Sequence, residues 1–399
     1  MTYSLCKLIM KFIWIFYIIC LGHLNLGYGI ENIGGKKLSP KQSSALVEPL
    51  KRAGANSVEL RNAIARISGE KTEGMAFLIQ HMPERDLKTL SSDYLIENVN
   101  YAYKARSESD WAKSVPKEIF FNDVLPYASI NERRDRWRKD FHARFSPLVK
   151  GAKTLEEAAQ VLNKEIWKII NVRYHASKRP KPDQSPYESI DAGFASCTGL
   201  SVLLIDACRS VGVPSRFVGT PMWSNKRGNH SWVEVWDGNS WQFTGACEYS
   251  AAGLSNAWFK GSASKAVKED PKHAIYAASW KQTKTNFPLI WDLGIDYVFA
   301  ENVTDNYTGN LGSRVFIQIF DKPGGKRVAT DVEVWMSGSE VASGRTRDST
   351  NDTNDMLGLS LKKGTNYKLK ATIKKAKDWS KSFNVKGERD EEIQFFLSE

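Results

Sequence analysis

Residues 196–216 read SCTGLSVLLIDACRSVGVPSR. Apolar residues recur there at helical spacing, in Leu200, Leu204, Ala207 and Val211. The pattern predicts a buried helix that begins at Cys197 and ends near Gly212, after which Pro214 forces an extended segment, 215–219. Cys197 is therefore expected at a helix N-terminus, where the peptide dipoles and the unpaired N–H groups favour the thiolate form of a cysteine.

A second informative stretch, NHSWVEVW, starts at Asn229. Its residues alternate as in a strand, and a turn made of Asp, Gly, Asn and Ser leads into a second predicted strand, 241–244. His230 lies at the mouth of the first strand, and its side chain has the same parity as those of Trp232 and Glu234. We expect these three side chains on one face of the strand.

These two stretches supply the first two groups of a cysteine-enzyme site. A cysteine nucleophile needs a base within hydrogen-bond reach, and the base needs a third group that fixes its tautomer. We therefore predict Cys197 as the nucleophile and His230 as the base, with the backbone N–H of Cys197 as one donor of the oxyanion hole. Taken singly, each residue has an ordinary alternative, a buried cysteine and a structural histidine.

The combination resembles the transglutaminase-like superfamily of papain-like cysteine enzymes, in its bacterial exported type. The resemblance is carried by the sequences SCTG at 196–199, GVPSR at 212–216 and NHSWVEVW at 229–236, and it extends over residues 154–258. It implies an α+β fold with a papain-like transglutaminase core. It also implies activity as a cysteine peptidase or amidase, or as an acyltransferase, without a cofactor.

The third member of the site is the point where this sequence departs from the family. Members usually carry an aspartate on the strand after the histidine strand, but Gly245 and Ala246 occupy that neighbourhood here. Glu248 is the nearest acid beyond them, and its carboxylate can accept a hydrogen bond from an imidazole. We predict Glu248 as the third member. The alternatives are that the site has no third member, or that Asp237 or Glu234 fills the role.

The predicted function is thiol-dependent acyl chemistry on the amides of a protein or peptide substrate, through a Cys-His-Glu triad. Water as acceptor gives hydrolysis of peptide or isopeptide bonds, and an amine as acceptor gives transfer. Hydrolysis is the favoured outcome for an exported basic protein. The alternative function is a catalytically inactive transglutaminase-like scaffold that binds protein or glycan at the cell surface.

The N-terminus has the pattern of a secretory signal. Lys7 and Lys11 precede the apolar run 12–21, and small residues follow up to Gly29. We predict a signal peptide over residues 1–29, and hence a protein that is exported to the periplasm, the cell surface or the medium, with no stable membrane span after signal removal. An uncleaved anchor is the alternative, although the run is short for a bilayer span.

Cysteine usage and charge constrain the partners. Once the signal is removed, Cys197, Cys208 and Cys247 remain, and this odd number indicates at least one unpaired thiol. A bond between Cys208 and Cys247 stays open. The formal net charge of +11 favours an anionic surface polymer as a partner, whereas no recognised module points to nucleic acid. The scattered histidines give no spacing typical of a metal site, so no metal is predicted.

The flanking regions differ in their patterns. Helical spacing predominates over residues 35–150, which we predict as a helical region, and the catalytic domain is predicted over 151–299. Residues 300–399 are predicted as a β-sandwich domain, because alternating runs separated by polar turns occur there. These runs are 315–320, 332–336, 367–373 and 392–397.

The sequence of the catalytic domain contains the pattern of a helix N-terminus at Thr154. Thr154 with Glu157 three residues later is typical of a capping box. The apolar positions that we expect to share one face of this helix are Ala158, Leu162, Ile166 and Ile169.

Overall fold

The computed structural model describes residues 32–308, 313–336, 338–351, 356–361, 364–373, 376–386 and 391–398. The expected signal peptide, 1–29, lies outside the described residues. The chain forms two compact units. The described part of unit 1 comprises residues 32–218, 231–257 and 277–301, and that of unit 2 comprises 219–230, 258–276 and the described residues from 302 onward. No helix in the described ranges is both long and apolar enough to cross a membrane.

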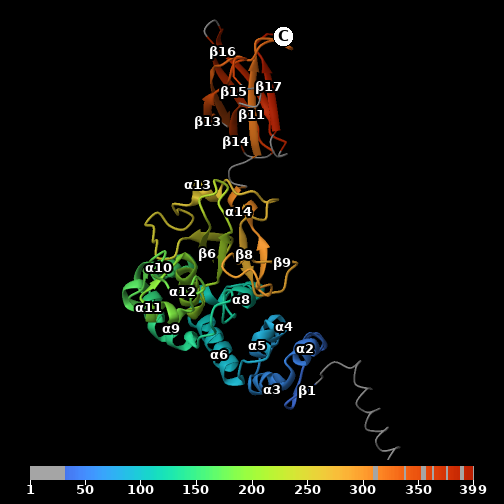
Figure 1. The fold of residues 1–399 in the computed structure, drawn as a ribbon, viewed down its shortest axis with the longest axis vertical. Coiled ribbons are helices and arrows are strands. Elements are labelled where there is room, and N and C mark those ends of the chain that lie inside the picture. The colour runs from blue at the N-terminus through green and yellow to red at the C-terminus, as the bar shows by residue number, and fades with distance from the viewer. Residues whose placement is uncertain are drawn as a thin grey trace, which may run out of the picture. The chain divides into compact units, whose positions relative to one another are not determined.

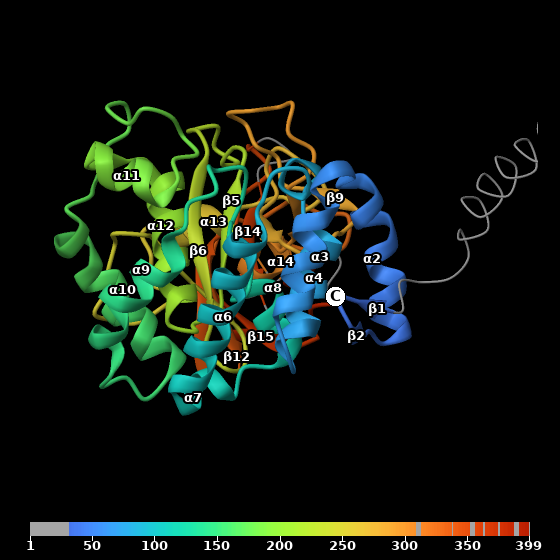
Figure 2. The same cartoon turned by 90° about the horizontal axis from the view of Figure 1, so that it is seen from below.

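Unit 1 opens with a short strand pair followed by helices. The pair is β1 (Asn32–Ile33) and β2 (Lys36–Lys37). The helices are α2 (Pro40–Arg52), α3 (Ser57–Arg66), α4 (Lys71–His81), α5 (Glu84–Leu87), α6 (Ser92–Glu108), α7 (Asp110–Lys113), α8 (Lys117–Asp123) and α9 (Trp137–Phe145). Helices α2 and α3 both pack against α4, as Figure 2 shows. Local signals start several of them: Ser39 forms a capping box with Gln42 before α2, and Ser91 caps α6.

The second part of unit 1 combines three helices with the main sheet. The helices are α10 (Leu155–Ile170), α11 (Pro186–Ala192) and α12 (Cys197–Ser210). The strands of the sheet lie in the order β7 (Trp241–Thr244), β6 (His230–Trp236), β5 (Ser215–Thr220), β8 (Tyr276–Ser279), β10 (Phe299–Asn302) and β9 (Thr285–Asn286). The predicted helix from Cys197 and the predicted strands at 215–219, 231–236 and 241–244 are thereby confirmed.

Helix α12 is the centre of unit 1. Helices α6, α9, α10 and α11 all contact it, and Figure 1 shows α9 to α12 gathered together beside β6. Every residue of α12 after Cys197 is buried. The apolar stripe read from the sequence therefore describes only part of its packing, because neighbours cover the helix on all sides.

Helix α10 begins as predicted but buries a different last residue. The Thr154 hydroxyl accepts from Glu157 N at 3.1 Å, whereas the Glu157 carboxylate accepts from Lys153 N at 2.7 Å instead of closing the box on Thr154. Of the four positions expected on one face, Ala158, Leu162 and Ile166 are buried, whereas Ile169 is 48% exposed and the next residue, Ile170, is buried. At the C-terminal end of the helix, the buried face therefore includes Ile170 and not Ile169.

The loop between α8 and α9 is largely buried although it has no regular structure. Buried carbonyl groups need donors. Arg138 Nη2 donates to Val124 O at 2.8 Å and to Pro126 O at 2.7 Å, and Arg209 Nη1 donates to Ala128 O at 2.9 Å. Arg138 Nη1 also donates to Arg209 O near the end of α12, at 3.0 Å. Two guanidinium groups thus tie the loop to α9 and α12.

The last part of unit 2 consists of two sheets. One has the order β14 (Leu357–Leu361), β11 (Ser313–Phe320) and β17 (Glu391–Phe396). The other has the order β13 (Ser339–Arg345), β12 (Asp331–Met336), β15 (Asn366–Ile373) and β16 (Ala376–Asn384). The four predicted runs are confirmed as strands β11, β12, β15 and β17, and β13, β14 and β16 were not predicted. Val315, Val334, Leu369 and Phe395 belong to one buried cluster that draws on both sheets.

We expect Arg138→Ala to destabilise unit 1 by at least about 3 kcal/mol, because the change leaves several buried carbonyl groups without a donor. The matched control is Arg136→Ala, which removes an arginine that is 53% exposed and paired with Glu97. Its loss should stay below about 1 kcal/mol. Urea unfolding followed by tryptophan fluorescence measures both variants. Equal stabilities would show that the Arg138 contacts do not hold the loop.

Candidate active site

A short segment that joins α11 to α12 positions Cys197. Helix α11 ends at Gly193, whose φ of 69° lies in the left-handed region that glycine adopts without strain. Strand β4 (Phe194–Ala195) follows, and it pairs in parallel with β3 (Arg173–Tyr174). The chain then enters α12 at Cys197, so a sheet-anchored segment fixes the residue that precedes the helix.

Close packing next to Cys197 explains the glycine two residues later. A Cβ at Gly199 would lie 3.0 Å from Ala195 Cβ and 3.3 Å from Ser189 Oγ. Cys197 itself remains partly exposed. The first turn of α12 therefore packs tightly against α11 and β4 while its thiol keeps some access to solvent.

The first turn of α12 also contacts the start of β6. Thr198 Oγ1 and Ser231 Oγ are both buried and lie 3.2 Å apart, at hydrogen-bond distance. Each of these residues directly follows a predicted site residue, Cys197 in one case and His230 in the other. This hydrogen bond is one direct link within unit 1 between the two sequence stretches that carry the predicted chemistry.

His230 is the last residue of its segment in unit 2, where aromatic rings surround it. Its ring centroid lies 4.9 Å from that of Phe259, 5.0 Å from that of Trp258 and 6.0 Å from that of Trp223. The imidazole is only 8% exposed, and this burial lowers its pKa to about 4. His230 is therefore a neutral imidazole at pH 7, able to accept a proton.

The Glu234 carboxylate forms an ion pair with an arginine of the neighbouring strand β5. Arg216 Nε on β5 donates to Glu234 Oε2 at 2.7 Å, and both side chains are almost fully buried. Arg216 also lies over the Trp241 ring, with its guanidinium carbon 4.0 Å from the ring centroid. This ion pair gives the Glu234 carboxylate a structural role in the sheet.

The Asp237 carboxylate accepts hydrogen bonds within the turn that joins β6 to β7. Its Oδ1 accepts from the backbone N–H groups of Asn239 and Ser240, each at 2.7 Å. Partial burial raises its pKa, but these hydrogen bonds and one from Gln242 outweigh that effect and hold the pKa below its usual range. The carboxylate serves to close the turn.

Glu248 follows β7 on an exposed segment. Its carboxylate folds back over Gly245: a Cβ at that position would lie 1.9 Å from Glu248 Oε2. The buried Asn163 of α10 holds this segment, because its Nδ2 donates to Gly245 O and its Oδ1 accepts from Cys247 N, both at 2.9 Å. Glu248 is thus carried by a segment that α10 fixes in place.

The cysteines other than Cys197 lie in less reactive settings. None of Cys197, Cys208 and Cys247 forms a disulfide, so the open pairing of the last two does not occur in this structure. Burial raises the pKa of Cys208 to about 12. Burial, and then the charge of Glu248, raise the pKa of Cys247. Within the described ranges, no three His, Cys, Asp or Glu side chains come together as a metal site.

The structure adds residues that the sequence analysis did not single out for the site. Trp258 and Phe259 enclose His230, and Asn163 fixes the segment before Glu248. A polar residue beside the apolar stripe of α10 was the available signal for Asn163. Nothing in the sequence pattern linked Trp258 or Phe259 to a histidine almost thirty residues away.

A comparison with protein families finds a match over the stretch that carries the resemblance. Residues 143–246 match the family model of the transglutaminase-like superfamily. This stretch contains Cys197 and His230 and ends just before Glu248. It confirms the predicted resemblance for these residues. No curated protein matches the chain.

Two solved structures are similar to parts of the chain. One is a “putative cysteine protease” from Cytophaga hutchinsonii, with 18% identity, a TM-score of 0.24, and coverage of 38% of this chain and 44% of that one. The other is a “putative protease” from Parabacteroides distasonis, with 8% identity, a TM-score of 0.25, and coverage of 61% and 37%. The chain thus spans less than half the length of either protein.

Trp258→Ala should raise the pKa of His230 from about 4 toward 6.5, because it removes an aromatic ring from the imidazole and admits water. The histidine Cε1–H signals, followed by NMR against pH, measure this change. Tyr174→Ala removes another exposed aromatic, one that is outside this cluster, and should leave the titration unchanged. An unchanged His230 pKa in Trp258→Ala would mean that this ring does not exclude water from the imidazole.

Proposed function

Residues 143–246 belong to the transglutaminase-like superfamily, and on this premise we propose that the chain is a cysteine enzyme of acyl chemistry, with Cys197 as nucleophile and His230 as base. The hydrogen bond between Thr198 and Ser231 carries the proposal, because it joins the residues that directly follow Cys197 and His230. This contact supports the proposal at the level of the backbone, because α12 begins at Cys197 and β6 begins at His230.

The proposed reaction begins with proton transfer from the Cys197 thiol to the His230 imidazole. The thiolate attacks the carbonyl carbon of an amide, and the backbone N–H of Cys197 donates to the developing oxyanion. The imidazolium then protonates the leaving amine as the C–N bond breaks, and a thioester remains. Water, deprotonated by His230, attacks the thioester, and the acid product leaves while Cys197 regains its proton.

Glu248 is the third member in this proposal. Burial that lowers the pKa of His230 to about 4 also makes the imidazolium costly to form, so the base needs a compensating negative charge. The two other candidate acids already have structural partners. Glu234 accepts a hydrogen bond from Arg216, and Asp237 accepts hydrogen bonds from the backbone of its own turn. Glu248, held on the segment that Asn163 fixes, is the carboxylate best suited to the role.

We propose hydrolysis of peptide or isopeptide amides rather than transfer to an amine, on a protein or peptide substrate. Export to the periplasm, cell surface or medium belongs to the same proposal, as does attraction of the basic chain to an anionic surface polymer. We also propose three parts: a helical region over 35–150, a catalytic domain over 151–299 and a β-sandwich over 300–399. The buried cluster that draws on both C-terminal sheets supports the last part.

Iodoacetamide should alkylate Cys197 near neutral pH much faster than Cys208 or Cys247, as peptide mass spectrometry measures. His230→Ala should slow alkylation of Cys197, because the base that removes its proton is lost. Cys197→Ala should abolish peptide hydrolysis with the fold retained, whereas Cys247→Ala, another partly exposed thiol, should keep it. Equal alkylation of Cys197 and Cys247 would favour the inactive scaffold instead.

Glu248→Gln should preserve the fold and lower the turnover rate strongly, by up to about 10⁴-fold as for a triad acid, because an amide cannot stabilise the imidazolium. The turnover rate of Glu248→Asp should lie between the rates of the unaltered protein and of Glu248→Gln. The matched control, Asp237→Asn, alters a carboxylate engaged in a turn and should cost little. Gly245→Ala should mimic Glu248→Gln, because the new methyl group displaces the carboxylate. Loss of activity only in Asp237→Asn would assign the third role to Asp237.

A further inference from the structure

A small pocket lies in unit 1, separate from Cys197. It opens between the loop that joins α8 to α9 and the chain around β8 and β10. We call it the Arg134 pocket; its lining includes His81, Ser129, Arg134, Arg209, Trp280 and Tyr297. None of these residues takes part in the proposed acyl chemistry.

Three buried polar atoms of this lining have no hydrogen-bond partner in the part of the chain that the structure describes. They are Arg134 Nη2, Ser129 Oγ and Trp280 Nε1. Two of them can only donate a hydrogen bond, and the hydroxyl can do so. Buried donors without partners are costly, at about 1–3 kcal/mol each. All three residues line one pocket, where a ligand that supplies acceptors would satisfy these donors.

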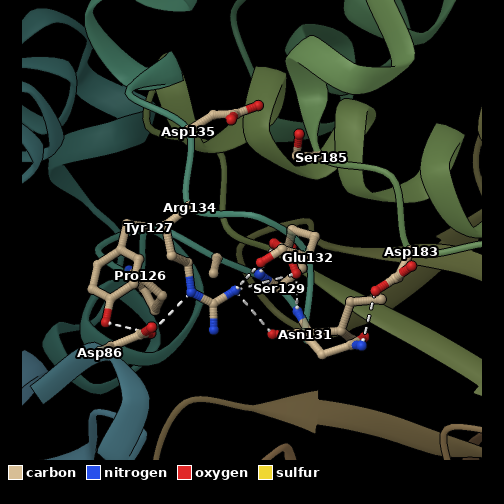
Figure 3. A network of polar contacts seen from close by, with 12 residues as sticks. Asp86, Pro126, Tyr127, Ser129, Asn131, Glu132, Arg134, Asp135, Asp183 and Ser185 are labelled. Carbon is tan, nitrogen blue, oxygen red and sulfur yellow. Dashed lines mark hydrogen bonds and ion pairs between the residues drawn. The ribbon is translucent and has the colours of Figure 1, made fainter. Parts of the chain in front are cut away.

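The Arg134 guanidinium is held rigidly, so its remaining nitrogen has a fixed direction. Its side chain is only 6% exposed. Nε donates to Asp86 Oδ2 at 2.9 Å, and Nη1 donates to Glu132 O at 2.7 Å. Figure 3 shows both contacts as dashed lines and the third nitrogen directed away from Asp86 and Glu132. A preorganised donor of this kind binds without further ordering.

The surroundings favour a negative charge. Burial raises the pKa of Asp206 well above its usual range and that of Asp123 to about 7, so these carboxyl groups only partly neutralise the buried Arg209. Arg85 adds a cation at the rim, where its Nη1 donates to Tyr297 Oη at 3.2 Å. An anion in the pocket would lie beside the guanidinium groups of Arg134 and Arg209, of which Arg134 is already paired with the carboxylates of Asp86 and Glu132.

The size of the pocket selects a small planar anion. Its volume is about 30 Å³. A water molecule needs roughly 10–15 Å³ of such volume, so the pocket holds about two oxygen-sized atoms. The two oxygens of a carboxylate match this space.

We propose that the Arg134 pocket binds the carboxylate of a small ligand, with Arg134 Nη2, Ser129 Oγ and Trp280 Nε1 donating to its two oxygens. The half-buried rings of Trp280 and Tyr297 then contact the apolar part next to the carboxylate. A free small acid and the C-terminus of a peptide offer the same chemistry, and they differ in what extends beyond the rim.

Calorimetric titration of the full chain with acetate, acetamide and sulfate tests the pocket. Saturable acetate binding with no acetamide or sulfate binding supports the proposal. A tripeptide with an unmodified C-terminus and its amidated form distinguish the two sources. Tighter binding of the first peptide than of acetate assigns a peptide C-terminus, and acetate binding at least as tight as that of the peptide assigns a free small acid.

Variants locate the binding site. Trp280→Phe removes one donor and Ser129→Ala another, and each should weaken acetate binding by about 10-fold or more, as expected for a hydrogen bond to a charged group. Trp335→Phe, the same change in β12 of unit 2, should leave binding unchanged. Thermal melting verifies that the variants are folded. No saturable acetate binding in the millimolar range, a preference for sulfate, or unaltered affinity in both pocket variants would overturn the proposal.

Discussion

Buried guanidinium groups bound to backbone carbonyl oxygens are the constraint on which unit 1 depends. The loop between α8 and α9 has no regular hydrogen bonds of its own, and burying it would be prohibitive without donors. Arg138 and Arg209 supply those donors from α9 and α12, while Arg134 serves the loop from within. Arginine suits this task, because its planar fork presents several fixed donors and stays charged.

The same principle positions the candidate site. Arg209 lies near the C-terminal end of α12 and Cys197 at its start, so the contacts that hold the loop also fix the helix that carries the thiol. Asn163 acts similarly from α10 by binding the backbone around Gly245 and Cys247. The proposed nucleophile, at a partly exposed helix end, is thus supported by buried polar contacts, which agrees with the need for preorganised geometry in catalysis.

His230 illustrates the balance between burial and charge. Aromatic rings around the imidazole keep it neutral, which suits a proton acceptor but penalises the imidazolium that the proposed reaction would form. A carboxylate beside the imidazole offsets that penalty, and we propose that Glu248, which lies on an exposed segment, supplies it. Glu234 and Asp237, each satisfied by its own neighbours, illustrate how acids near a site can be structural.

Local signals in the sequence determined the helix at Cys197, the strands around His230 and the family, because periodicity, caps and turns act over a few residues. They could not determine that Thr198 meets Ser231, that Asn163 binds the Cys247 N–H, or that Trp258 covers His230. These contacts join residues far apart in the chain. Only tertiary packing decides them, and it also sets which inward-facing residue of α10 is buried, Ile170 rather than Ile169.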